Sequence, residues 1–312
     1  MIAMSRAPGR AAVRIYKFAA SNMTSENYPA LFRSADDASD RKQSLYLMLI
    51  RCEYLLLFVA AVISTELFES VTFYLFYAFI FVLAICLLLA RAMMKPEQDW
   101  YHCRALAESV KTLTWRYVMQ AQPFSSGLAP PVARTEFIQH LQRTLDENRS
   151  TAEEIEAEWS DQDQITPEME RLRSLTLEER KVVYLRDRVQ EQRSWYNRKA
   201  ISNKKLAKMW IGLGVFCYVA AIALVLSRIR FTDWHYWPIE PIIVLASSII
   251  GWMQIKKFNE LGAAYTVAAH EIGLIIPRLL DVSGDAELSA CVNEAELAFS
   301  REHTMWIARQ SN

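Results

Sequence analysis

The most constraining feature of this chain is a pair of long apolar runs that contain no charged residue. Val71 to Ala90 supplies twenty such residues and Met209 to Ser227 supplies nineteen. A helix needs about 20 apolar residues to cross the hydrocarbon core of a bilayer, and a soluble domain seldom needs a helix that is apolar on every face. The sequence therefore predicts a transmembrane helix at each position.

Two further apolar segments accompany these runs and are less regular. Residues 46–64 include Arg51 and Glu53, and residues 234–253 include Glu240. Each segment is joined to one of the uncharged runs by a short loop, so we expect it to form the other half of a helical hairpin. The sequence thus predicts four transmembrane helices arranged as two hairpins.

The distribution of basic residues orients the hairpins. The loop at 65–70 contains no Lys or Arg and the loop at 228–236 contains two, whereas fourteen lie within about 20 residues of the opposite helix ends. Basic flanks remain in the cytoplasm, so both termini and the long middle region should be cytoplasmic. The formal net charge is zero, and we expect no direct nucleic-acid binding.

The rest of the chain should also be helical, because only eight glycines and ten prolines occur in 312 residues. We expect an all-α membrane protein whose long helices extend into a cytoplasmic helical bundle. The expected helical features are an apolar face on 100–121, a capping box at Thr176 and Glu179, one uninterrupted helix from Leu177 to Ser227, a helix from the fourth span to just before Pro277, and an amphipathic helix at 285–309.

An internal repeat relates the two hairpins at an offset of 163 residues. Segment 46–64 falls on 209–227, and 71–90 falls on 234–253. We interpret the match in hydropathy and loop length as duplication of a hairpin unit. The expected domains are a disordered N-terminal tail (1–27), a first two-helix unit (28–125), an acidic helical connector (126–176), a second two-helix unit (177–282) and a C-terminal cytoplasmic helix (283–312).

The connector is strongly acidic. Residues 146–170 carry ten acidic side chains and one basic side chain, Arg149. Ser150 with Glu153, and Thr166 before Pro167, have the residue types that begin helices. The segment is either a regulatory docking site or a solvated helical connector, and the sequence favours the connector.

Catalytic motifs are absent from the sequence. It has no phosphate-binding loop, and His270-Glu271 begins an HExxH pattern that lacks the second histidine. The five cysteines are odd in number and widely spaced, which is not typical of a disulfide framework or a zinc site. We expect no enzyme activity, no cofactor and no metal.

Polar residues inside the membrane segments are better functional candidates. Arg51 lies about six residues inside the first span, where it either snorkels to the membrane surface or lines a water-filled path between subunits. Small residues at Gly212 and Gly214 should face close neighbours. The candidate pore or membrane-charge residues are Arg51, Glu53, Glu240 and Ser247.

The sequence also resembles a known family, the SLATT proteins, which are two-transmembrane effectors associated with SMODS nucleotidyltransferases and SLOG sensor domains. The resemblance begins with Tyr28-Pro29-Ala30-Leu31-Phe32 before the first span, and the second half looks like the tandem version of the family. After the second span the motif residues are Trp100, Arg104, Glu108, Lys111, Trp115, Arg116 and Tyr117. Glu108 and Lys111 are spaced to pair on one helix face.

The resemblance implies an effector of a prokaryotic anti-phage defence system, located in the inner (plasma) membrane. Such an effector forms a pore that breaches this membrane in abortive infection. Four helices are too few to enclose a wide pore, so homo-oligomers are expected. The lipid bilayer and either a signalling nucleotide or a sensor protein are the expected partners. The alternative is a non-catalytic membrane scaffold that recruits a cytoplasmic partner.

Overall fold

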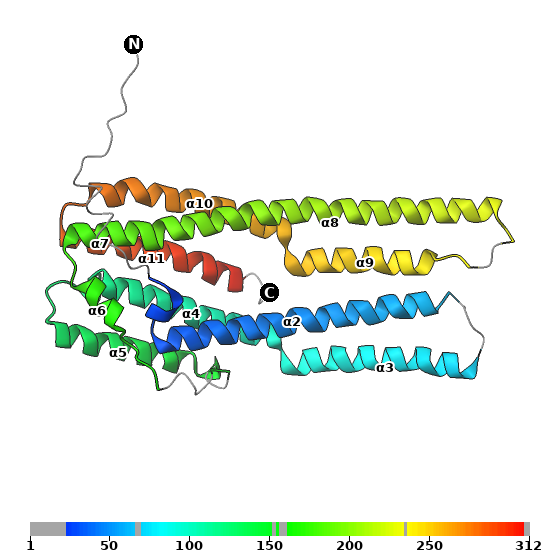
Figure 1. Ribbon diagram of the computed structural model, residues 1–312, viewed down its shortest axis with the longest axis horizontal. Coiled ribbons are helices and arrows are strands. Elements are labelled where there is room, and N and C mark those ends of the chain that lie inside the picture. The colour runs from blue at the N-terminus through cyan, green and yellow to red at the C-terminus, as the bar shows by residue number, and fades with distance from the viewer. Residues whose placement is uncertain (1–22, 66–69, 152–153, 156–160, 234–235, 309–312) are drawn as a thin grey trace, which may run out of the picture. The chain divides into compact units, whose positions relative to one another are not determined.

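The computed structural model describes residues 23–65, 70–151, 154–155, 161–233 and 236–308 (Figure 1). Over these ranges the chain is helical and contains no strand, which confirms the all-α class. The elements are η1 (Ser25–Asn27), α2 (Ala30–Ile63), α3 (Val71–Met94), α4 (Pro96–Val118), α5 (Pro130–Glu147), η2 (Arg149–Thr151), α6 (Pro167–Arg173), α7 (Leu177–Tyr184), η4 (Leu185–Gln190), α8 (Glu191–Arg230), α9 (Ile239–Lys256), α10 (Phe258–Asp281) and α11 (Asp285–Ala308).

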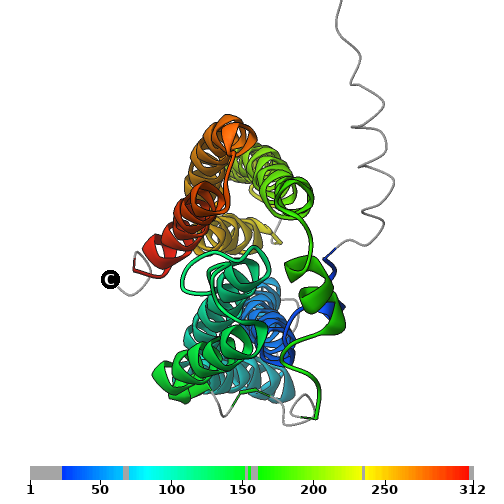
Figure 2. The ribbon, with the colours of Figure 1, turned by 90° about the vertical axis from the view of Figure 1, so that its left-hand side faces the viewer.

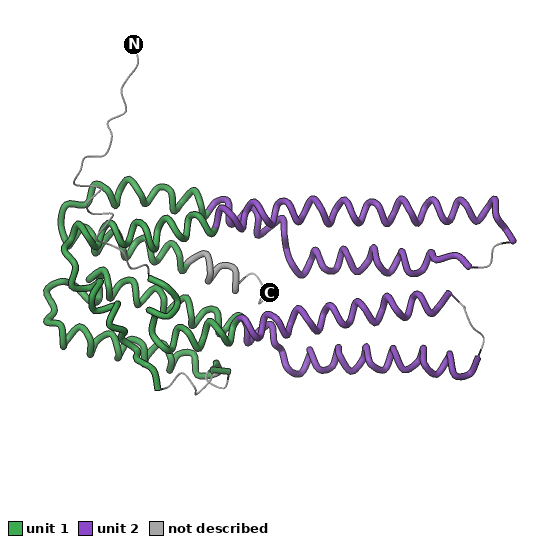
Figure 3. Tube along the Cα trace, viewed as in Figure 1, with its two compact units in different colours: residues 1–39, 101–195, 268–312 green, residues 40–100, 196–267 purple. Residues whose placement is uncertain are grey.

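The chain divides into two compact units, each built from segments that are distant in sequence (Figure 3). Unit 1 consists of residues 1–39, 101–195 and 268–312, and unit 2 of residues 40–100 and 196–267. The divisions between the units fall inside four helices, α2, α4, α8 and α10. These four helices therefore each contribute residues to both units.

Unit 2 contains the apolar segments. Its two hairpins are formed by α2 with α3 and by α8 with α9 (Figure 1). In the described part of the chain, four helices are long and apolar enough to cross a membrane, as the sequence predicted. In the segment Val71–Val118, only 6% of the most apolar stretch is buried within the protein. Phe76 and Leu75 of α3 are among its exposed side chains. Such outward-facing apolar surface suits contact with lipid.

A lysine in the left-handed conformation interrupts each half of the chain. Lys95 has φ 44° between α3 and α4, and Lys257 has φ 46° between α9 and α10. Each donates its backbone N–H four residues back, to Arg91 and to Met253 respectively, at 3.0 and 2.9 Å. The long helix expected after the fourth span is present as α10, but it begins at Phe258 as a separate helix, because the left-handed Lys257 ends α9.

Two further expectations about the long helices need adjustment. Helix α10 does not stop before Pro277 but continues to Asp281. Proline removes one backbone donor, and burial of the following Leu279 helps to hold the last turn in place. The segment from Leu177 to Arg230 is helical throughout, but residues Leu185–Gln190 adopt a π-helix, a form that occurs mostly as short insertions in α-helices.

The expected capping box is confirmed at the start of α7. The side chain of Thr176 accepts a hydrogen bond from the backbone of Glu179, whose carboxylate accepts one from the Thr176 backbone. At the start of α6, the Thr166 side chain accepts a single capping hydrogen bond from the backbone of Met169. Glu153 lies outside the described residues, so the helix start expected at Ser150 and Glu153 cannot be compared with the structure.

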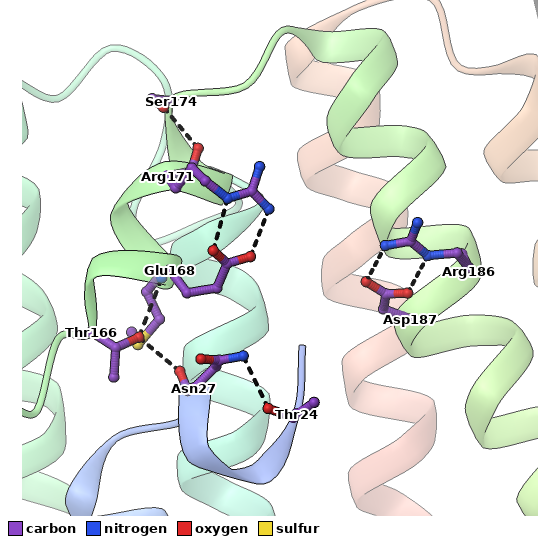
Figure 4. A network of polar contacts seen from close by, with 9 residues as sticks. Thr24, Asn27, Thr166, Glu168, Arg171, Ser174, Arg186 and Asp187 are labelled. Carbon is purple, nitrogen blue, oxygen red and sulfur yellow. Dashed lines mark hydrogen bonds and ion pairs between the residues drawn. The ribbon is translucent and has the colours of Figure 1, made fainter. Parts of the chain in front are cut away.

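Contacts with α6 hold the end of the N-terminal segment (Figure 4). Thr166 donates its hydroxyl hydrogen to the carbonyl of Asn27 at 2.8 Å, and Asn27 donates to Thr24 at 3.0 Å. On the same short helix, Arg171 forms a bidentate pair with Glu168. Residues 24–27, which the sequence assigned to a disordered tail, therefore form a short 3₁₀ turn held by hydrogen bonds, and residues 1–22 lie outside the described ranges.

The core of unit 1 surrounds α4. Figure 2 shows the helices nearly end-on. The expected apolar face of α4 is buried, including Cys103, Ala107 and Val110 with no exposed surface. Helix α11 buries the face that the sequence predicted, through Leu288 and Val292. The first part of α11 therefore packs within unit 1.

Candidate functional site: a polar cavity among apolar helices

Unit 2 contains a cavity of about 420 Å³ between α2, α3 and α9. Its wall is mostly apolar, with Leu57, Phe81 and Val244 among the lining residues. It also includes polar side chains drawn from all three helices, namely Tyr54, Ser64, Tyr77, Glu240, Ser247 and Ser248. Polar groups in an apolar segment are costly unless they find partners or line a hydrated space, so this cavity is the candidate functional site.

Helical spacing explains how α9 contributes to the wall. Glu240, Val244, Ser247 and Ser248 are separated by four, three and one residues, and they share one face of the helix. Glu240 lies in the first turn of α9, where the helix dipole favours a negative charge. The cavity consequently has a carboxylate near the start of α9 and two hydroxyl groups about two turns further along.

Helix α9 lies close to α2 at Gly251. A Cβ atom at this position would overlap the hydroxyl group of Tyr54 and lie 3.2 Å from the ring carbon that carries it. Glycine at 251 therefore provides room for a cavity-lining tyrosine. A Cβ at Gly214 would meet Ile249 at 3.7 Å, whereas nothing lies within 4 Å at Gly212. The expected close neighbour is thus present at Gly214 and absent at Gly212 among the described residues.

The four candidate membrane residues do not form one site. Glu240 and Ser247 line the cavity, but Arg51 and Glu53 do not. Glu53 forms an ion pair with Arg91 at 3.1 Å, and the guanidinium carbon of Arg51 lies 5.3 Å from the ring centre of Trp252. Sequence reasoning missed Tyr54, Ser64, Tyr77 and Ser248, although polar residues in apolar runs were a usable signal.

The motif residues of α4 connect this helix to the start of α2. Arg104 forms ion pairs with Asp36 at 2.9 Å and with Glu108 at 2.6 Å. The charge of Glu108 also acts on Lys111, as the spacing of the two residues predicted, and the Lys111 ammonium lies 5.9 Å from the ring centre of Tyr28. These contacts bring together residues separated by about 70 positions.

Aromatic residues of the same motif occupy the core of unit 1. Trp115 is fully buried and donates its indole hydrogen to the Tyr28 hydroxyl at 2.8 Å. Burial raises the pKa of the Tyr28 phenol. Of the remaining motif residues, Trp100 stacks near Tyr46 in unit 2, with ring centres 6.3 Å apart. The aromatic members thus have structural roles in the described contacts.

Tyr117 connects the motif to α6. Its hydroxyl donates to Glu170 at 2.6 Å, and Arg134 donates two hydrogen bonds to the same carboxylate at 3.0 Å. Burial alone would raise the pKa of Glu170, but the hydrogen bonds from Arg134 and Tyr117 outweigh burial and hold it below its usual range. The buried Nε of Arg116 has no hydrogen-bond partner among the described residues.

A buried ion pair in unit 1 was not anticipated from the sequence. Arg188, in the π-helical segment, forms a bidentate pair with Glu296 of α11, with N–O distances of 2.9 and 2.6 Å. Both side chains are almost completely buried, at 1% and 0% exposed. Tyr184 and Thr112 also donate to the Glu296 carboxylate, at 2.9 and 3.2 Å.

Metal-binding and cysteine chemistry find no support in the described residues. No group of three or more His, Cys, Asp or Glu side chains there is arranged to hold a metal ion. All five cysteines are free thiols. The polar cavity is therefore the feature of unit 2 with the clearest chemical character.

These observations define a multi-pass helical membrane protein with a polar cavity among its apolar helices. Residues 29–181 match the SMODS and SLOG-associating 2TM effector domain 3, and residues 184–306 match the SMODS and SLOG-associating 2TM effector domain 1. The chain belongs to the SLATT family and carries two of its domains in tandem. No curated protein and no solved structure is similar enough to this chain to count as a match.

Proposed function

We propose that this protein is an anti-phage defence effector that forms a homo-oligomeric pore in the inner membrane and is gated from the cytoplasmic side. SLATT domains are associated with anti-phage defence effectors, and this association supplies the biological setting. The observation that carries the proposal is the polar cavity between α2, α3 and α9. A cavity lined by Glu240 and hydroxyl groups offers ions and water a partly polar route.

Assembly of several copies is part of the proposal. A single chain provides four candidate membrane helices, and these do not surround a wide channel. The cavity-facing Ser247 of α9 remains exposed in the single chain, as do Leu245 and Ile250 on the same helix. Neighbouring copies would cover such surfaces and extend the cavity into a continuous path.

The long helices provide a route for a gating signal. Helices α2, α4, α8 and α10 each contribute residues to both units. In the proposed topology, which follows the basic flanks of the spans, unit 1 and both termini are cytoplasmic. A signalling nucleotide or a sensor protein that rearranges unit 1 would then shift the membrane segments of α2 and α8, which continue into unit 1 without a break.

Reconstitution tests the proposal directly. The full chain is placed in liposomes at increasing protein-to-lipid ratios, dye release is measured, and the oligomeric state is read by chemical cross-linking of the same vesicles. We expect release that rises with oligomer formation, and a lower release rate for Glu240→Gln and Ser248→Leu. Glu260→Gln is the control because Glu260 is outside the cavity lining.

Two results would contradict the pore. Vesicles that retain dye in every oligomeric state, both with and without added signalling nucleotides, would contradict the pore and favour the alternative, a membrane scaffold that recruits a partner. If Glu240→Gln and Glu260→Gln lowered dye release equally, the cavity would not be the route by which solutes cross the membrane. The scaffold predicts a retained partner in pulldowns that is lost on deletion of residues 146–170.

A further inference from the structure

A group of cations meets in unit 2 at the basic ends of its membrane helices. Arg51 of α2 and Lys256 of α9 both lie against the indole ring of Trp252, with their charged groups 5.3 and 5.7 Å from the ring centre. Lys199 of α8 is close enough for its charge, like that of Arg51, to act on Lys256. Three helices that are distant in sequence thus bring positive charge to one place.

Arg51 and Lys256 differ in their partners from two other cations of unit 2. Lys42 is paired with Asp99 at 2.9 Å, and Arg91 is paired with Glu53 at 3.1 Å. Neither Arg51 nor Lys256 forms an ion pair or a hydrogen bond with a carboxylate in the described part of the chain. Like charges repel, and both Arg51 and Lys256 lie against the same ring, so the two cations favour an anion from outside the protein.

The surroundings indicate what kind of anion fits. Met48 and Leu55 on α2 are 51% and 61% exposed, and each lies about one helical turn from Arg51 in the sequence. Trp252 has the amphipathic character typical of the membrane interface. A phospholipid fits both features, because its phosphate can contact the cations while its acyl chains lie on the exposed apolar surface. A free phosphate has no acyl chains and would leave that surface uncovered.

We propose that Arg51 and Lys256, on either side of their contact with Trp252, bind the headgroup phosphate of an anionic phospholipid. The geometry resembles basic pockets between membrane helices that hold anionic headgroups. The site is separate from the cavity that contains Glu240 and Ser247, because none of its residues lines that cavity. Lipid binding here does not depend on pore formation.

Native mass spectrometry of the detergent-solubilised full chain provides the test. The delipidated protein is titrated with phosphatidylglycerol and, separately, with neutral phosphatidylcholine. We expect wild type to retain phosphatidylglycerol preferentially. Removing each cation should weaken binding about fivefold, so that Arg51→Gln with Lys256→Gln weakens it about twenty-five-fold.

A matched control comes from the opposite end of α8. Arg228→Gln with Arg230→Gln removes the same amount of charge but leaves the basic group intact, and it should preserve the preference. Arg51→Lys with Lys256→Arg keeps both charges and should also bind, which separates loss of charge from misfolding. Melting temperatures of all variants check that each remains folded.

Several outcomes would overturn the assignment. Equal binding of phosphatidylglycerol and phosphatidylcholine by wild type would show that the group does not recognise an anionic headgroup. If phosphatidylglycerol binding weakened equally in the control and in the Arg51/Lys256 variant, the effect would come from the net charge of the protein and not from this site. Displacement of phosphatidylglycerol by millimolar inorganic phosphate, with the phosphate retained on the protein, would assign the group to a free anion.

Discussion

Replacing Glu296 with alanine should destabilise unit 1 far more than the same change at Glu294, two residues away on α11. The Glu296 carboxylate is completely buried and accepts hydrogen bonds from Arg188, Tyr184 and Thr112. Its removal leaves the Arg188 guanidinium buried without its counter-charge. Breaking a buried pair in this way costs about 3–5 kcal/mol, because the remaining charge is neither paired nor hydrated.

The control pair is exposed to solvent. Glu294 pairs with Arg278 at 2.5 Å, with side chains 57% and 62% exposed, and such pairs contribute about 0–1 kcal/mol. A loss of 1 kcal/mol lowers the melting temperature by about 2–4 °C in a domain of 150–250 residues. We therefore expect a decrease of about 6–20 °C for Glu296→Ala and under about 4 °C for Glu294→Ala.

Thermal unfolding of the full chain in detergent, followed by tryptophan fluorescence, measures both shifts. The fully buried Trp115 reports on unit 1. The variant Arg188→Met with Glu296→Leu removes both charges and should melt above Glu296→Ala, since an apolar replacement leaves no buried charge. Similar shifts for Glu296→Ala and Glu294→Ala would refute the reasoning, as would a double variant that melts below Glu296→Ala.

Two further predictions concern one packing contact and one carboxylate. Gly251→Ala should lower the melting temperature because its new Cβ would displace Tyr54. Gly212→Ala has open space around it and should be neutral or stabilising by up to about 1 kcal/mol. Equal shifts in melting temperature for the two variants would show that the overlap with Tyr54 has no effect on stability. Burial alone raises the pKa of Glu170, but hydrogen bonds dominated by Arg134 lower it overall. Its stabilising contribution should be complete above the unfolded-state pKa of about 4.5 and be lost as the pH falls through the lowered value. Melting curves of Glu170→Gln should accordingly depend less on acid pH than those of wild type, and parallel curves would contradict this.

The sequence by itself determined the membrane helices and several helix boundaries. Uncharged apolar runs require a lipid-like environment whatever their neighbours are, so the runs at 71–90 and 209–227 were sufficient to predict spans. The capping box at Thr176 was equally local, because its hydrogen bonds join residues three positions apart. The family motif residues were found in the sequence as well, but not their partners.

Only the tertiary structure decided which polar residues meet. The cavity combines side chains from α2, α3 and α9, and the pair of Arg188 with Glu296 joins residues 108 positions apart. The left-handed lysines at 95 and 257 also had no signal in hydropathy, since a change in one backbone dihedral leaves composition unchanged. Local patterns fix how each segment folds because their interactions lie within a few residues, whereas contacts between distant segments depend on how the helices pack.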